Sequence, residues 1–325
     1  MGKATIFAWA AFALILQTAA ASADAADCTP KLLSALPLIA EPDGRYAVDV
    51  AINGATHRLL LATTSAHSAF FQAFIEGAGL HQHELPERKN FYVLESKAVG
   101  IAVADSLSIA GNTANNVQAL VIKTAYAPDE QVVGTLGADL LASFDVDIDF
   151  KGARVNLYAA NPCEGKPVYW SKAYSDLAFD GDTGFAVPMT LDGKTLAVRI
   201  DTLIPHSQMR MDIANEYFGL TETSPGIVQA GVDDTNHLPI YRYPFGALAA
   251  DGVAIAKPAI ALEGYADAEH CDGKRHSDFG PVPGTHRFHT CHNGGDMSLG
   301  MLDLKPTHMY IAYRARRVYL SVASN

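Results

Sequence analysis

The fold is decided by Tyr46-Ala-Val-Asp-Val-Ala-Ile-Asn-Gly54 and by a copy of its pattern, Phe185-Ala-Val-Pro-Met-Thr-Leu-Asp-Gly193, at a constant offset of 139 residues. In both stretches apolar side chains alternate with other residues and an Asn-Gly or Asp-Gly pair follows, which is typical of a strand that turns back as a hairpin. The returning strands continue as Leu59-Leu-Leu-Ala-Thr-Thr-Ser-Ala-His-Ser68 and Val198-Arg-Ile-Asp-Thr-Leu-Ile-Pro-His-Ser207. The chain therefore contains a duplicated β unit.

The two copies differ at the position that matters most for chemistry. Thr63 corresponds to Thr202, but Ala62 stands where the second copy has Asp201. One copy therefore supplies a carboxylate at this place, and the other supplies a methyl group.

A second correspondence extends the duplication along the chain. Gly137-Ala-Asp-Leu-Leu141 matches Gly300-Met-Leu-Asp-Leu304 at an offset that has grown from 139 to 163, so the second copy holds 24 extra residues. We assign this extra length to an insertion over 269–293, which has about that size. The predicted organisation is an N-terminal lobe over 24–160, a linker rich in turn-forming residues over 161–182 and a C-terminal lobe over 183–325.

Strand patterns separated by turn signals dominate the rest of the chain. Helical pieces are few and short, and they are expected at 69–76, 139–143 and 212–217. This balance predicts an all-β protein with small helices.

Residues 1–23 have the pattern of an export signal. Lys3 supplies a positive charge, an apolar run follows over 4–20, and Ala21-Ser-Ala23 provides the small residues of a cleavage site. A membrane anchor is the competing interpretation, but the run is short for a span, which needs about 20 apolar residues. We therefore expect removal of the signal, no membrane insertion afterwards, and a periplasmic or secreted protein.

The charge of the chain restricts its partners. The formal net charge is −11 at pH 7, and the sequence holds no basic cluster. Nucleic acids and anionic membrane surfaces are bound by basic patches, so neither is an expected partner. The length suits two domains that each bury a core, and the protein is expected to be a monomer.

The cysteines are Cys28, Cys163, Cys271 and Cys291. An even number in an exported chain indicates disulfides, and four cysteines allow three pairings. Cys28 and Cys163 flank the first copy, whereas Cys271 and Cys291 lie close together in the second. The pairing Cys28–Cys163 with Cys271–Cys291 is therefore preferred among the three.

These motifs together resemble the retropepsin-like and pepsin-like aspartic proteases. The resemblance is carried by a strand, an Asn/Asp-Gly turn, a second strand that ends in Asp-Thr, and Gly134-Thr-Leu-Gly-Ala-Asp-Leu-Leu141 followed by the strand that ends at Phe150. It covers nearly all of the chain after the signal. It implies an all-β, bilobal β-barrel fold with two homologous lobes, short helices and a cleft between the lobes.

The family reaction needs two carboxylates, one from each lobe, that share a proton because like charges so close cannot both ionise. Asp201 and Thr202 match the first two positions of the Asp-Thr-Gly motif, but Leu203 replaces its glycine. In the first copy Ala62 replaces the aspartate, and only Thr63 matches. The sequence therefore predicts an incomplete dyad, in which Asp201 and Thr202 are the retained motif residues and Ala62 and Thr63 are the degenerate counterpart.

Three functions are consistent with this pattern, and the sequence leaves open whether the protein is an enzyme. The preferred one is an exported protein whose interlobe cleft binds an extended peptide or an unfolded protein segment. The second is an active aspartic endopeptidase that pairs Asp201 with another acid, for which Asp105, Asp139 and Asp303 are candidates in sequence. Asp139 is expected to be structural, since the resemblance places its segment beneath the active-site loop.

The third function is metal binding by the histidine-rich insertion, through His286, His289 and His292 near Cys291. Such spacing is compact enough for zinc, but a cysteine paired in a disulfide is lost as a thiolate ligand. A disulfide-closed surface loop is therefore favoured, and no cofactor is expected.

Two further groups of polar residues are expected to be structural. His67-Ser68 and His206-Ser207 cannot readily form Ser–His pairs, because adjacent strand residues point to opposite faces. Asp145, Asp147 and Asp149 lie on one strand face, which is expected to be solvated.

Overall fold

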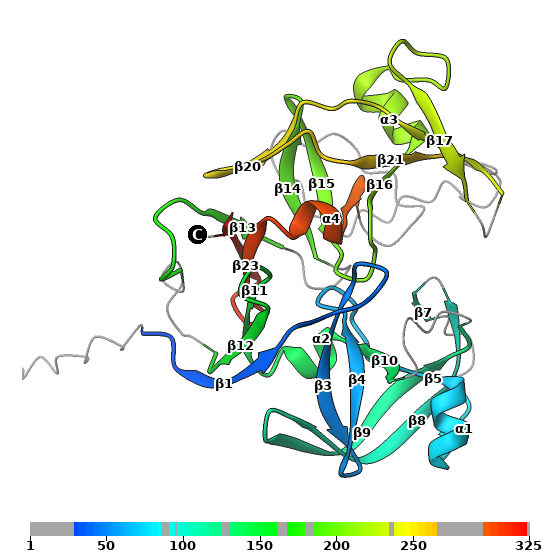
Figure 1. The fold of residues 1–325 in the computed structure, drawn as a ribbon, viewed down its shortest axis with the longest axis vertical. Helices are drawn as coiled ribbons and strands as arrows, with labels where there is room; N and C mark the ends of the chain where they lie inside the picture. Colours follow the sequence, from blue (N-terminus) through cyan, green and yellow to red (C-terminus); the bar gives the residue numbers. More distant parts are fainter. Residues whose placement is uncertain are drawn as a thin grey trace, which may run out of the picture.

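The protein is bilobal and consists mostly of strands. The structure, a computed structural model, describes residues 29–85, 91–94, 96–124, 131–160, 168–179, 185–233, 237–264 and 295–323. Two nine-stranded sheets form the lobes, and a six-stranded sheet lies beside both of them (Figure 1). The predicted all-β, bilobal fold with short helices is confirmed.

The first lobe is built around one mixed sheet. Its strands follow the order β2-β3-β4-β10-β5-β9-β8-β6, and β7 pairs with β8 outside this path. The elements are β2 (Ile39–Ala40), β3 (Tyr46–Ile52), β4 (Ala55–Leu61), β5 (Ala69–Phe71), α1 (Gln72–Ala78), β6 (Gln82–His83), β7 (Tyr92–Val93), β8 (Ser96–Ile109), β9 (Asn112–Ile122), β10 (Val132–Leu136) and α2 (Ala138–Leu141).

The second lobe has a sheet in the order β17-β18-β21-β16-β22-β15-β14-β19-β20. Its elements are β14 (Ala186–Leu191), β15 (Lys194–Ile200), β16 (Ser207–Arg210), α3 (Met211–Phe218), β17 (Val228–Val232), β18 (Pro239–Arg242), β19 (Ala247–Ala250), β20 (Val253–Ala256), β21 (Ile260–Glu263), β22 (Met297–Leu299) and α4 (Met301–Leu304).

The six-stranded sheet joins the two halves of the chain. Its order is β1-β12-β11-β23-β24-β13, and each neighbouring pair is antiparallel. The strands are β1 (Leu32–Pro37), β11 (Asp145–Asp149), β12 (Arg154–Tyr158), β13 (Ser175–Ala178), β23 (Thr307–Ala312) and β24 (Arg317–Val322). The pairing of β11 with β23 ties the end of the first repeat to the end of the second.

The two hairpins predicted from the repeat are present in equivalent form. β3 pairs with β4 through Ile52 and Ala55, and β14 pairs with β15 through Leu191 and Lys194. The two turn residues between each pair of strands have positive φ, which Asn-Gly and Asp-Gly adopt with little strain.

The repeat also appears in the packing beneath two equivalent loops, the one that follows β4 in the first lobe and the one that follows β15 in the second. Ser68 Oγ donates to Asp139 Oδ1 at 2.6 Å and accepts from Gly137 N at 2.8 Å. In the second lobe Ser207 Oγ donates to Asp303 Oδ2 at 2.5 Å and accepts from Gly300 N at 3.0 Å. The structural role predicted for the serine of each His-Ser pair is confirmed.

Gly137→Ala is expected to destabilise the first lobe by about 1–3 kcal/mol, as overpacking of a filled site does. A Cβ at Gly137 would lie 2.5 Å from the carbonyl carbon of His67, which is backbone and cannot turn away. Gly77→Ala in α1 is the matched control, because a Cβ there meets no atom within 4 Å and alanine favours the helix. Urea unfolding of both variants checks this, and equal stabilities would contradict it.

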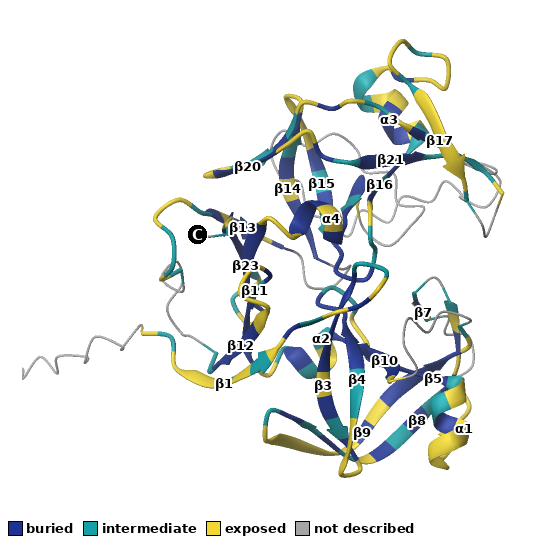
Figure 2. Ribbon diagram, viewed as in Figure 1, coloured by how far each residue is buried: buried dark blue, intermediate teal, exposed yellow. Residues whose placement is uncertain are grey.

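The prediction of a solvated face on β11 is wrong. Asp145 and Asp147 are fully buried, and only Asp149 is partly exposed (Figure 2). The face is covered by the segment 168–174, in which Trp170 stacks on His308 with ring centroids 4.0 Å apart. The alternation of residues along the strand correctly placed these aspartates on one face. It could not predict that the segment 168–174 covers this face.

The buried carboxylates are satisfied by side chains from several strands. Asp147 accepts hydrogen bonds from Asn156 Nδ2 at 2.9 Å and from the Tyr169 hydroxyl at 3.0 Å, and it contacts His308 Nε2. The Tyr310 hydroxyl donates to Asp145 at 3.1 Å. Burial and then the charge of Asp145 raise the pKa of Tyr310 far above its ordinary value, so this hydroxyl stays a donor.

Several predictions fall outside the described residues. These are the export signal over 1–23, the insertion over 269–293, both disulfides (Cys28–Cys163 and Cys271–Cys291) and the metal candidates His286, His289 and His292. Among the residues that the structure does describe, no helix is long and apolar enough to cross a membrane, and no group of His, Cys, Asp and Glu is arranged to hold a metal ion.

Candidate functional site

The loops that follow β4 and β15 meet where the lobes join. Thr202 Oγ1 donates to the carbonyl oxygen of Leu61 at 2.6 Å and accepts from Thr63 N at 3.2 Å, and the two threonine hydroxyls are 3.3 Å apart. All three contacts cross between the lobes at buried positions, so they fix the two motif loops against each other.

Ala62 and Asp201 occupy equivalent places at the junction of the two lobes, which we call the midline. Ala62 N donates to Leu136 O, and Asp201 N donates to Leu299 O, both at 2.9 Å. The motif backbones are therefore held alike by a parallel neighbour, β10 in one lobe and β22 in the other. The difference between the lobes lies in the side chains and not in the path of the chain.

The carboxylate of Asp201 is engaged on both oxygens. Oδ1 accepts the backbone N–H of Leu203 at 2.9 Å, and Oδ2 lies 2.8 Å from Nη2 of Arg199 in an ion pair. Within the described part of the chain, no second carboxylate contacts that of Asp201. The partner of Asp201 is thus a cation two residues earlier on the same strand face.

The Ala62 side chain lies in an apolar cluster that spans the two lobes. We name this the midline cluster; it comprises Ala47, Leu60, Ala62, Ala69, Phe71, Val93, Ala98, Leu120, Ile122, Val132 and Leu203. Leu203 is its one member from the second lobe. The two departures from the motif, Ala62 and Leu203, are therefore parts of a single apolar surface.

A hairpin of the first lobe covers the midline cluster. Phe91 and Leu94 pack against it together with Val93 of β7, and the Phe91 ring meets His67 edge-on at 5.1 Å. Tyr92, between them, points outward and is among the exposed large apolar side chains. The first-lobe side of the junction is therefore filled by protein side chains.

Comparison with known proteins shows what the first lobe is similar to. Residues 48–140, which hold the first lobe's motif and the Gly-Ala-Asp segment, match the aspartyl protease family model. Over this stretch the chain is similar to the aspartic proteases. The retropepsin-like resemblance predicted from the sequence is confirmed, and it is the first lobe that carries the match.

One solved structure is similar to part of this chain. It is a retropepsin-like aspartic protease from Rickettsia conorii, at 18% identity and a TM-score of 0.29, and the alignment covers 39% of this chain and 91% of that one. A comparison with curated proteins gave no match.

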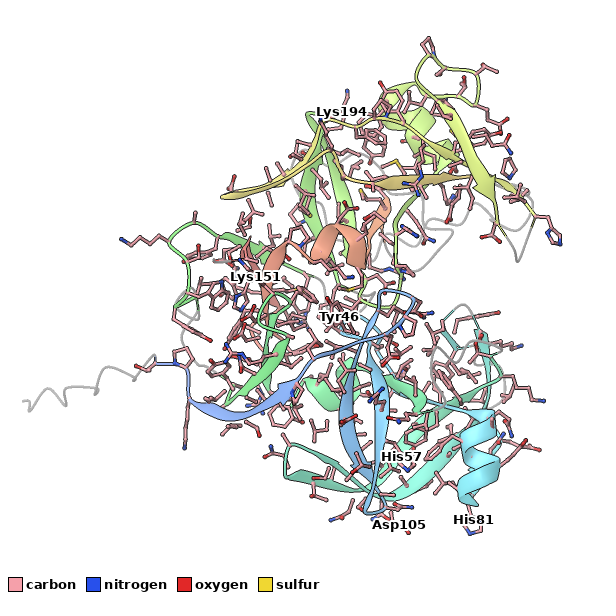
Figure 3. All side chains as sticks on the ribbon, in the orientation of Figure 1. Tyr46, His57, His81, Asp105, Lys151 and Lys194 are labelled. Carbon is pink, nitrogen blue, oxygen red and sulfur yellow. The ribbon has the colours of Figure 1, made fainter. Side chains whose placement is uncertain are left out.

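Two of the three candidate second acids are used by the fold. Asp139 accepts hydrogen bonds from the backbone and hydroxyl of Ser68, as the prediction of a structural role requires. Asp303 is buried and accepts from Ser207 Oγ and from Ala259 N. Asp105 is exposed on β8, and Figure 3 places it at the outer end of the first lobe.

The arrangement differs from a family dyad in its charges. A dyad brings two acids together so that one can take a proton while the other gives one. Here the second-lobe acid meets a guanidinium, and the first-lobe position is a buried methyl group. The signal for Arg199 was available in the sequence, because residues two apart on a strand share a face, but the sequence reasoning did not use it.

Proposed function

We propose that this protein is an exported aspartic-protease-like binding protein with an incomplete dyad, and that its interlobe cleft holds an extended peptide or an unfolded protein segment. The observation that carries the proposal is the ion pair of Asp201 with Arg199, in a midline where Ala62 replaces the other acid. Export rests on the pattern of residues 1–23.

Loss of peptidase activity follows from the chemistry of the pair. Hydrolysis of an amide by this family needs a water molecule held between an acid and a base. The guanidinium of Arg199 is already protonated and does not lose that proton, so it can act neither as the base nor as the acid. Positioned acid–base help typically contributes about 10²–10⁴ in rate, and a lone ion-paired aspartate supplies little of it.

A binding role is supported by the contacts that hold the two lobes together and by the hairpins of both lobes. The threonine contacts at the midline still hold two lobes together, and both lobes keep the hairpins at β7 and β17, which lie on the same side of the molecule in Figure 1. The strand β17 is exposed along its whole length and, among the strands that the structure describes, pairs with β18 alone. Edge strands of this kind bind extended peptides by main-chain hydrogen bonds, with side-chain pockets adding selectivity.

The mature protein is expected to leave an unfolded protein substrate intact from acidic to neutral pH, while a fluorescent peptide library binds to it. Unfolded casein with gel and mass-spectrometric detection measures the first, and fluorescence polarisation measures the second. Cleavage that disappears in Asp201→Ala would establish the active endopeptidase instead. Cleavage that persists in that variant would point to a contaminating protease.

A further inference from the structure

We propose that Arg199 is the ligand-recognising residue of the cleft and that it selects ligands with a free carboxylate. The inference rests on the proposed binding function and names the chemistry of its ligand. The carboxylate can be the C-terminus of a peptide or an acidic side chain within it. Both present the same group to a guanidinium.

The first reason is the geometry of the ion pair. Arg199 and Asp201 lie two residues apart at the end of β15 and so share one face. The Asp201 side chain is 10% exposed and both its oxygens are engaged, whereas the Arg199 side chain is 28% exposed. A larger part of the Arg199 side chain than of the Asp201 side chain is therefore open to solvent.

The second reason is the number of donors. A guanidinium carries five N–H groups in a planar fork and commonly binds carboxylates through two of them. Arg199 contacts Asp201 through Nη2, and this is its one polar side-chain contact among the residues that the structure describes. Among the described residues, the remaining N–H groups of Arg199 have no acceptor, and a second carboxylate would use them.

The third reason is the contrast between the lobes. The residue equivalent to Arg199 in the first lobe is Leu60, which is fully buried in the midline cluster with Ala62 and Leu203. The first-lobe position is thus filled by a buried apolar side chain, and the cation at the junction comes from the second lobe alone among these two equivalent positions.

Asp201 competes with such a ligand for the same guanidinium. It holds Arg199 in place, and it also offsets part of the positive charge that attracts the ligand. Removing the charge of Asp201 while keeping its shape should therefore strengthen carboxylate binding. An Arg199 that merely neutralises Asp201 gives no such result.

The test uses the mature protein and fluorescein-labelled decapeptides of mixed sequence that end in leucine. Three sets are compared by fluorescence polarisation: one with a free C-terminal carboxylate, one amidated and without acidic residues, and one amidated with an internal glutamate. We expect the free-carboxylate set or the glutamate set to bind about 10-fold more tightly than the uncharged set, as charge-assisted hydrogen bonds allow. The set that binds identifies the source of the carboxylate.

Variants decide whether Arg199 is responsible. Arg199→Gln should remove the 10-fold preference, and Asp201→Asn should increase it. Arg314→Gln is the control, because Arg314 is an exposed arginine between β23 and β24, outside the sheets of both lobes. Thermal unfolding confirms that each variant is folded.

The outcomes separate the two proposals. Equal binding of all three sets, unchanged in Arg199→Gln, overturns carboxylate selection and leaves the cleft as a peptide-binding site. Absence of binding by every set overturns the proposed binding function together with this inference. A preference that Arg314→Gln abolishes as fully as Arg199→Gln does overturns the assignment to Arg199.

Discussion

Asp147→Ala is expected to lower the free energy of unfolding by about 3–5 kcal/mol, the cost typical of removing one partner from a buried pair. The Asp147 side chain has no exposed surface, and it accepts from Asn156 and Tyr169 while contacting His308. Alanine would leave these donors without their acceptor beneath the stacked ring of Trp170. Because the strands involved come from both halves of the chain, the loss weakens the joint between the lobes.

The measurement is urea unfolding of the mature protein, with far-UV circular dichroism as the signal, because Trp170, its one tryptophan, stacks on His308 within the altered network. Asp176→Ala provides the control on the same sheet, since Asp176 forms an ion pair with Arg317 in which both side chains are about one-third exposed. Surface pairs contribute about 0–1 kcal/mol, so this variant should unfold close to the wild type. If Asp147→Ala were as stable as Asp176→Ala, the polar network under the segment 168–174 would have no role in stability.

What could be predicted from the sequence was set by local patterns. Asn53-Gly54 and Asp192-Gly193 predict hairpins because few residues accept positive φ, and the hairpins are where the pattern puts them. The Gly137 and Gly300 segments could be matched because close backbone packing recurs in both lobes. The bilobal all-β fold follows from these local features and their repetition.

What could not be predicted depends on contacts between distant strands. The alternation along β11 groups Asp145 with Asp147, but burial of that face is decided by Trp170 and His308, which lie far away in the sequence. Leu203 could be recognised as a departure from the motif, but its place in an apolar cluster of the other lobe could not. Long-range packing of this kind has no local signature.

Ala62→Asp, the change that returns the missing carboxylate to the motif, is expected to destabilise the protein by about 3–5 kcal/mol and to leave it without peptidase activity. The side chain of Ala62 is fully buried among the apolar residues of the midline cluster. A carboxylate placed there gains no described cation of its own, because Arg199 is paired with Asp201, and it adds a like charge across the midline. An uncompensated buried charge typically costs this much.

Thr64→Asp is the control for this substitution, since Thr64 is in the same loop but partly exposed, and its variant should unfold within about 1 kcal/mol of the wild type. Adding Leu203→Gly to Ala62→Asp should recover part of the lost stability, because it opens the cluster to water at the new carboxylate. Urea unfolding and casein cleavage are measured for all three variants. Wild-type stability together with cleavage in Ala62→Asp alone would mean that the site lacks only one acid. Stability recovered in the double variant would mean that the cost of the new carboxylate depends on the packing of Leu203 in the same cluster.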